Sequence, residues 1–198
     1  MSRTFRLVDG AVRATFHPAE VELLRRLHDE LRSSLASSDR SDPVVRRLFP
    51  PAILGDADAE ERVRDLLDEL LLADRLAGLE AVIAMLERGV THRGRLRIEL
   101  VDDEPVTLLR VLNDVRLAIG ARIDVEALDR DRVGRDDPEA YPLAVMDHLA
   151  WWQEQLVAII DPPAASQLPD PDLVEPEDPD ASSGGGSQPP DADPQEPT

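Results

Sequence analysis

The sequence predicts a mainly α-helical fold of the α+β class, with a helical body, a small N-terminal β-hairpin and one further strand. Three observations predict this fold. Leucine-rich stripes at helical spacing recur between residues 18 and 160, and two short apolar segments flank an Asp-Gly pair near the N-terminus. Residues 94–101 alternate between apolar and charged side chains, which is typical of a half-buried strand.

The hairpin is predicted over residues 3–16. Its centre is Asp9-Gly10, a pair that tolerates the positive φ angles of a type I′ turn. A two-stranded hairpin is only marginally stable alone, so it needs a further partner. Residues 94–101 are the natural third strand.

The helices are predicted from apolar stripes and from the residues that bound them. The first begins at Pro18 and is broken by the polar stretch 33–42. Residues 43–54 form one helical turn and an ordered connector. Residues 58–88 form either one bent helix or two helices joined near Gly78, and the stripe leaves both alternatives open.

Two more helices follow the third strand. Asp102 or Asp103 caps a helix that starts near Pro105 and ends near residue 120, and residues 142–160 form the last one. The neighbours Trp151 and Trp152 point about 100° apart on that helix, so one is expected in the core and the other at its edge. Asn113-Asp114 is interpreted as exposed on the outer face, with a polar interior contact as the alternative.

The chain divides into a single helix-rich domain, residues 1–160, and an acidic tail, residues 161–198. The tail holds ten Asp or Glu residues, no Arg or Lys, and ten of the 17 prolines. Such a segment buries too little apolar surface to offset the entropy of ordering, so it is predicted to be disordered. It carries −10 of the net charge of −19 and leaves −9 on the domain.

Several classes of function are excluded by missing residues or motifs. The chain has no cysteine, so disulfides, thiol chemistry and Cys-based metal sites are ruled out. No two of the four histidines stand three or four residues apart, and the sequence has no glycine-rich phosphate loop and no nucleophile motif. Because it also lacks a signal peptide and a membrane span, we expect an intracellular, soluble, non-enzymatic protein without metal or cofactor.

One short stretch carries an excess of positive charge. Residues 88–97 contain four arginines, and Arg46-Arg47 form a smaller cluster. These side chains are interpreted either as exposed loop and strand residues or as contacts to DNA phosphates. A domain of charge −9 repels DNA at long range unless its cations gather on one surface.

Four segments carry a family resemblance. They are residues 43–50, 94–98, 112–125, and 143–160 with its tryptophan pair. In this order, over about residues 3–160, the chain resembles actinobacterial AosR-type oxidative stress transcriptional regulators, formerly catalogued as a domain of unknown function. The resemblance implies a cytoplasmic regulator linked to oxidative stress and sulfur metabolism, which acts with RNA polymerase factors or at promoters. It supplies no catalytic residues.

These observations favour a regulator that works mainly through a protein partner such as a sigma factor or RNA polymerase. DNA contact would be secondary and would use Arg93, Arg95 and Arg97, together with Arg46 and Arg47. The alternative is a helical adaptor or scaffold that binds no nucleic acid. A further hypothesis is that the acidic tail competes with phosphate for the arginines. Oligomeric state is left open.

Overall fold

The computed structural model describes residues 3–37, 39–50 and 57–162, with side chains throughout except those of residues 57–68. The predicted tail therefore lies outside the described residues beyond position 162, and so does the connector predicted at 51–54. No helix within the described ranges combines the length and apolarity needed to cross a bilayer.

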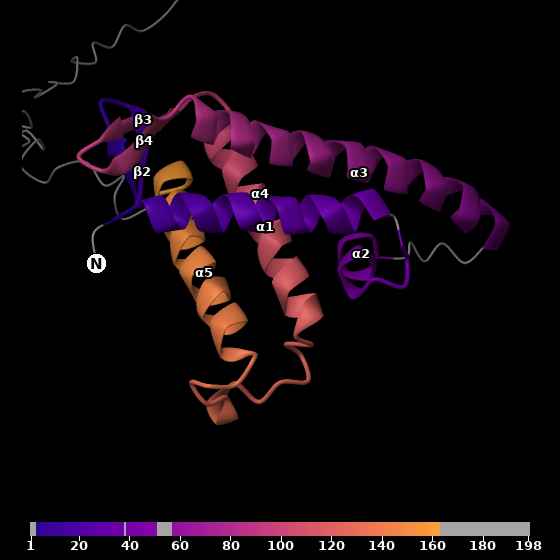
Figure 1. Cartoon of the computed structure of the whole chain (residues 1–198). Helices are drawn as coiled ribbons and strands as arrows, with labels where there is room; N and C mark the ends of the chain where they lie inside the picture. Colours follow the sequence, from indigo (N-terminus) through magenta and orange to yellow (C-terminus); the bar gives the residue numbers. More distant parts are fainter. Residues whose placement is uncertain (1–2, 38, 51–56, 163–198) are drawn as a thin grey trace, which may run out of the picture. The chain divides into compact units, whose positions relative to one another are not determined.

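A four-stranded antiparallel sheet is formed by two hairpins (Figure 1). Its strands are β1 (Phe5–Val8), β2 (Ala11–Phe16), β3 (Val90–His92) and β4 (Arg95–Leu100), in the order β1-β2-β4-β3. The predicted hairpin and third strand are confirmed. The prediction of a single further strand was incomplete, because the three residues of β3 are too few to show an alternating pattern.

Both hairpins close through two-residue turns in which each residue has a positive φ. The predicted pair Asp9 and Gly10 has φ angles of 52° and 80°, and Arg93 and Gly94 have 50° and 72°. These are the left-handed conformations of a type I′ turn, in which glycine carries no Cβ penalty. The second turn was not predicted, since arginine is an uncommon residue at its first position.

The helices lie together on one side of the sheet and partly agree with the stripes. They are α1 (Pro18–Ser37), α2 (Pro43–Leu48), α3 (Ala57–Glu87), α4 (Glu104–Arg122) and α5 (Ala140–Ile160). Helix α1 ends at Ser37, within the polar stretch 33–42 that was predicted to break it, although the first residues of that stretch are still helical and Ser34 and Leu35 are buried. Residues 58–88 form the one-helix alternative, although the first part of their apolar face lies outside the described side chains.

The predicted caps and helix ends are confirmed only in part. Asp103 is the N-cap of α4 but makes no side-chain capping hydrogen bond. Glu104, at the first helical position, accepts instead from the backbone N–H of Val101 at 2.9 Å. Helix α5 begins at Ala140, two residues before the predicted start, and a short 3₁₀ helix, Arg130–Arg132, lies in the loop before it.

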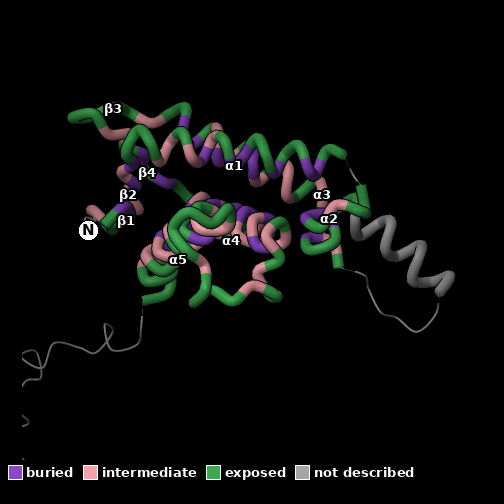
Figure 2. The backbone as a smooth tube through the Cα atoms, turned by 60° about the horizontal axis from the view of Figure 1, so that its bottom comes forward, coloured by how far each residue is buried: buried purple, intermediate pink, exposed green. Residues whose placement is uncertain are grey.

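The core lies between the sheet and the helices and continues among the helices as far as α2, and Figure 2 marks the buried residues of these elements. Trp152 is fully buried and packs edge-on against Phe5 and Phe16, with ring centroids 6.4 and 5.3 Å away. Its indole N–H donates to Thr4 Oγ1 at 3.1 Å. Trp151 is half-buried, so the split predicted for the tryptophan pair is confirmed.

Helix α5 also holds the start of β1 in place. The side-chain carbonyl of Gln155 accepts hydrogen bonds from the backbone N–H groups of Thr4 and Phe5, at 2.8 and 3.2 Å. The inner face of the sheet is thus covered by helices, and its opposite face carries the residues with odd numbers on β2 and β4. The predicted site residues Arg95 and Arg97 lie on this outer face, which no helix of the described residues covers.

Candidate functional site

Strand register brings together arginines that are far apart in the sequence. Arg6 of β1 stands opposite Arg13 of β2, and Arg13 stands opposite Glu99 of β4. Residues directly opposite one another on antiparallel strands lie about 5 Å apart. Arg13 uses part of this proximity in a long ion pair to Glu99, 3.8 Å between nitrogen and oxygen.

The neighbouring rows of the same face add two more guanidinium groups. Arg97 stands between Thr15 of β2 and Val90 of β3, and Arg95 stands opposite His92. Alternate residues on a strand are about 6.7 Å apart, so these rows follow one another closely. We call the four residues Arg6, Arg13, Arg95 and Arg97 the arginine face.

The arginine face has a local charge opposite to that of the whole chain. Among the strand residues on this side of the sheet, Glu99 is the single carboxylate, against four guanidinium groups. Arg6 and Arg97 are exposed to solvent, and so is Glu99. The exposed guanidinium groups of Arg6 and Arg97 can therefore bind an anion through charge-assisted hydrogen bonds, and Arg13 can do so when it leaves Glu99.

Two other arginines of the 88–97 cluster behave differently. Arg93 occupies the turn between β3 and β4 and is exposed at the end of the face. Arg88 has a structural role, because its guanidinium group binds the Glu104 carboxylate and donates a hydrogen bond to the Glu99 backbone carbonyl at 2.8 Å. The hydrogen bond from Arg88 lowers the pKa of Glu104 and raises the pKa of Arg88 itself.

The predicted pair Arg46 and Arg47 does not join this surface. Both are exposed in the last turn of α2, at the opposite end of α1 from the sheet (Figure 1). Arg47 pairs with Glu126 at 3.0 Å. Sequence analysis also missed Arg6 and Arg13. Their alternation with apolar residues was visible, but the pairing of β2 with β4, which completes the face, was not.

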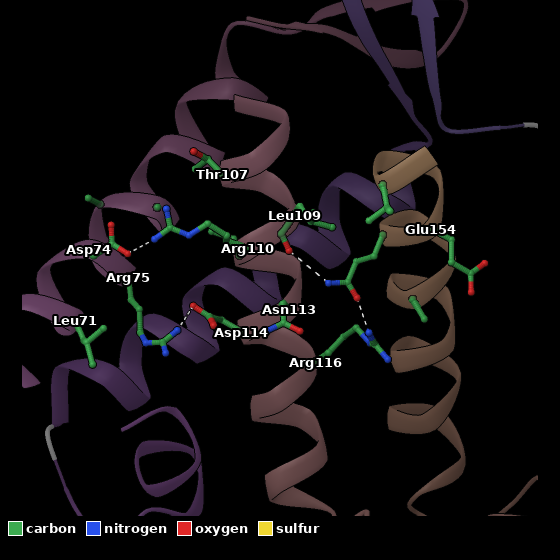
Figure 3. A pocket seen from close by; sticks show the side chains of 16 residues that line it. Leu71, Asp74, Arg75, Thr107, Leu109, Arg110, Asn113, Asp114, Arg116 and Glu154 are labelled. Atoms are coloured by element: carbon green, nitrogen blue, oxygen red, sulfur yellow. Dashed lines mark hydrogen bonds and ion pairs between the residues drawn. The ribbon is translucent and has the colours of Figure 1, made fainter. Parts of the chain in front are cut away.

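A second candidate surface is a groove of about 950 Å³ whose floor is α4 and whose sides are α3 and α5 (Figure 3). Its lining includes the half-exposed apolar residues Leu71 and Val157, which are 40% and 47% exposed. Two ion pairs cross from α3 to α4, Asp74 with Arg110 and Arg75 with Asp114. The groove thus offers both apolar contact and charges of both signs.

Arg75 has a structural role within this groove. Besides Asp114, it donates to the Leu48 carbonyl at 3.1 Å and lies over the Phe49 ring, 5.5 Å from its centroid. It therefore ties the end of α2 to α3 and α4. The interpretation of Asp114 as an outer-face residue was wrong, since its side chain is 15% exposed and makes the polar interior contact of the alternative. Asn113 is exposed, as predicted.

The described residues offer no arrangement for metal binding. Within residues 3–37, 39–50 and 57–162, no group of three or more histidine or carboxylate side chains could hold an ion. Asp102, Asp103 and Glu104 stand where the chain enters α4, and Glu104 is engaged by Arg88 and Val101.

Comparison with known proteins identifies one family. The model of the family described as Domain of unknown function (DUF2017) matches residues 2–160. Neither a curated protein nor a solved structure matches the chain. The matched residues include the whole arginine face and all three helices of the groove. The chain therefore belongs to the family called Domain of unknown function (DUF2017).

Proposed function

We propose that this protein is a cytoplasmic, non-enzymatic transcriptional regulator linked to oxidative stress. It acts mainly by binding a protein partner of the transcription machinery, such as a sigma factor or RNA polymerase. The arginine face makes a secondary contact with DNA phosphates. The resemblance to AosR-type regulators supports the regulatory role, and the convergence of four arginines on one uncovered sheet face carries the DNA contact.

The dimensions of the arginine face suit a nucleic-acid backbone. From Arg95 to Glu99 the strand covers about 13 Å. A DNA strand advances about 3.4 Å along the helix axis per phosphate, so this length spans about four phosphates. Among the strand residues on this side of the sheet there is no Phe, Tyr or Trp for base stacking, and the single imidazole is that of His92. The face therefore favours backbone contact without sequence reading.

Electrostatics make this contact weak without a partner. The net charge of the chain is −19, and the domain alone carries −9. At low salt the distant carboxylates repel DNA, and at about 0.15 M salt, where the screening length is about 8 Å, the attraction between the arginines and the phosphates is itself weakened. Free DNA would be bound poorly, and the same face could add affinity once a protein partner holds the chain at a promoter.

The groove between α3, α4 and α5 is the surface we assign to that partner. Its apolar residues Leu71 and Val157 lie beside charges of both signs, a combination that fits an amphipathic helix of the partner. The ion pair between Arg75 and Asp114 connects α3 to α4, so it holds one side of the groove in position relative to its floor. A partner helix would bury its apolar side there and place its charged edges against Arg110 and Glu154.

The DNA contact is tested by fluorescence anisotropy with a short duplex at several salt concentrations. Binding by the wild-type chain should weaken with a slope of log affinity on log salt near −3. Arg97→Gln should lower affinity about fivefold at low salt and reduce the slope by about 0.9. The matched control is Arg32→Gln, which removes the same charge from α1, where Arg32 pairs with Glu80 at 3.3 Å.

The outcome separates surface recognition from general charge. Equal losses for Arg97→Gln and Arg32→Gln would show that only net charge matters. No binding by the wild type at micromolar concentration and low salt would overturn the DNA contact and leave the protein partner.

The alternative is a helical adaptor that binds no nucleic acid, and the net charge of −19 favours it. The same groove would then serve an unrelated protein. Affinity capture from a native lysate, with Val157→Asp as a groove-disrupted control, separates the two functions. Loss of a sigma factor or polymerase from the variant supports the regulator, and loss of a protease or metabolic enzyme supports the adaptor.

A further inference from the structure

A smaller hollow of about 530 Å³ adjoins the partner groove and contains an unusual arginine. It lies between α2, α4, α5 and the residues that follow α4, and it shares Asn113 and Arg116 with the groove. Three guanidinium groups line it, from Arg46, Arg47 and Arg116. None of them belongs to the arginine face, so this site is independent of the DNA contact proposed above.

Arg116 is half-buried, and no carboxylate pairs with it within the described part of the chain. Its Nη1 group donates to the side-chain carbonyl of Gln153. The amide nitrogen of Gln153 donates in turn to the Leu109 carbonyl at 3.4 Å, which fixes the carbonyl toward Arg116. The Nε atom of Arg116 is buried and has no hydrogen-bond partner among the described residues.

This situation is costly for an arginine. The guanidinium group stays charged at every physiological pH, so it cannot escape partial burial by losing its proton. A neutral amide carbonyl compensates a buried charge less than an anion does. The other half-buried arginine of the groove, Arg75, also has a buried Nε atom without a hydrogen-bond partner among the described residues, but its guanidinium group is paired with the Asp114 carboxylate. An anion bound beside Arg116 would supply the missing charge.

The surroundings of Arg116 are suited to such an anion. Arg46 lines the hollow and makes no ion pair among the described residues, while Arg47 is partly neutralised by Glu126 at 3.0 Å. Asn113 adds an exposed amide that can donate hydrogen bonds. The lining also contains Asp124, whose carboxylate has no ion pair among the described residues and would repel an anion. The ligand must therefore be small enough for Arg46 and Arg116 to hold it without contact with Asp124.

We propose that this hollow binds a small, multiply charged oxyanion, carrying carboxylate or phosphate groups, through Arg116 and Arg46. Guanidinium groups recognise both kinds of group by bidentate hydrogen bonds. Because Arg116 also lines the partner groove, the bound anion would contact the same side chain that a docked partner meets. The site would therefore couple a small molecule to partner binding.

The test measures thermal unfolding of the full chain with pyrophosphate, citrate or chloride at equal ionic strength. A specific ligand at ten times its Kd should raise Tm by about 3–6 °C relative to chloride. A rise with pyrophosphate alone assigns a phosphate ligand, and a rise with citrate alone assigns a carboxylate ligand. A rise with both indicates a site that reads charge, and no rise with either overturns the proposal.

Variants place the effect at this site. Arg116→Gln should abolish the rise in Tm, and Arg46→Gln, an exposed position, should weaken binding about tenfold or more in calorimetric titration. Arg46→Gln decides the matter if the Arg116 variant does not fold. Arg6→Gln on the arginine face should leave anion binding unchanged while it weakens DNA binding. Equal losses in Arg46→Gln and Arg6→Gln would show unspecific screening and overturn the proposal.

Discussion

The arginine face and the partner groove use the same kind of residue in opposite ways. On the sheet, four guanidinium groups share one carboxylate and project from an uncovered surface. In the groove, Arg75 and Arg110 each have a carboxylate from the neighbouring helix, and Arg75 makes two further contacts at the end of α2, with the Leu48 carbonyl and the Phe49 ring. An arginine exposed on a strand is accessible to an external anion, while a half-buried arginine paired with a carboxylate stabilises the fold.

The largest expected effect is the loss of stability when a groove pair is broken. Asp114→Ala leaves Arg75 half-buried without its carboxylate, so the free energy of unfolding should fall by about 2–3 kcal/mol. Asp74→Ala breaks a pair that is more than half exposed and should cost less than about 1 kcal/mol. Urea unfolding followed by circular dichroism compares the two. Similar losses would mean that burial does not distinguish these arginines.

The next effect concerns the charge that opposes the arginine face. Removing residues 161–198 eliminates ten carboxylates and no cations. DNA affinity should rise about tenfold at low salt, and the gain should fade above about 0.15 M as screening shortens the range of repulsion. Anisotropy titrations of the full and shortened chains measure it. An unchanged salt dependence would leave the tail as a segment that promotes solubility.

Substitution of Glu99 should have a smaller effect, and it should raise DNA affinity, whereas removal of an arginine lowers it. Glu99→Gln removes the carboxylate of the face and releases Arg13 from its ion pair, so DNA affinity should rise about threefold. Glu22→Gln, an exposed carboxylate on α1, removes the same charge elsewhere. If both variants bind DNA equally, the local arrangement of the face is irrelevant.

The smallest expected effect is the loss of stability when the ion pair between Arg88 and Glu104 is removed. The pKa of Glu104 is lowered in the folded protein by Arg88, so its ionised form stabilises folding. This contribution is present above the ordinary carboxyl pKa of about 4.3 and is lost as pH falls through the lower folded value. Because Arg88 is 40% exposed, Glu104→Gln should cost less than about 1 kcal/mol near pH 7. Unfolding curves at pH 7 and pH 3 should show that this difference becomes smaller at the lower pH.

Local patterns predicted the elements whose causes are local. The hairpin follows from Asp9-Gly10, and the burial of Trp152 follows from its place in a helical stripe. Helix α1 extends into the predicted polar break as far as Ser37, because Ser34 and Leu35 are buried and tertiary packing outweighs the weak helix propensity of serine. Strand β3 is held by pairing with β4, which no pattern within its three residues records.

The candidate sites were predicted only in part, for the same reason. Arg95 and Arg97 were identified as a cluster in the sequence, but Arg6 and Arg13 join them only through pairing between strands more than 80 residues apart. For the same reason, the sequence did not predict the ion pair between Arg75 and Asp114, or that Arg116 lines both the partner groove and the smaller hollow. Sequence patterns report the face on which a side chain lies, and long-range pairing decides which faces meet.

The cluster of edge-on aromatic rings around Trp152 allows the packing of the sheet to be followed by intrinsic fluorescence. The chain has two tryptophans and one tyrosine, so its fluorescence comes almost entirely from neighbouring indoles in unequal environments. Trp152 is sealed between Phe5 and Phe16, whereas Trp151 is partly accessible. A collisional quencher should reduce the emission of Trp151 first and leave a blue-shifted emission from Trp152. The same measurement shows for each variant above whether the sheet still packs against α5.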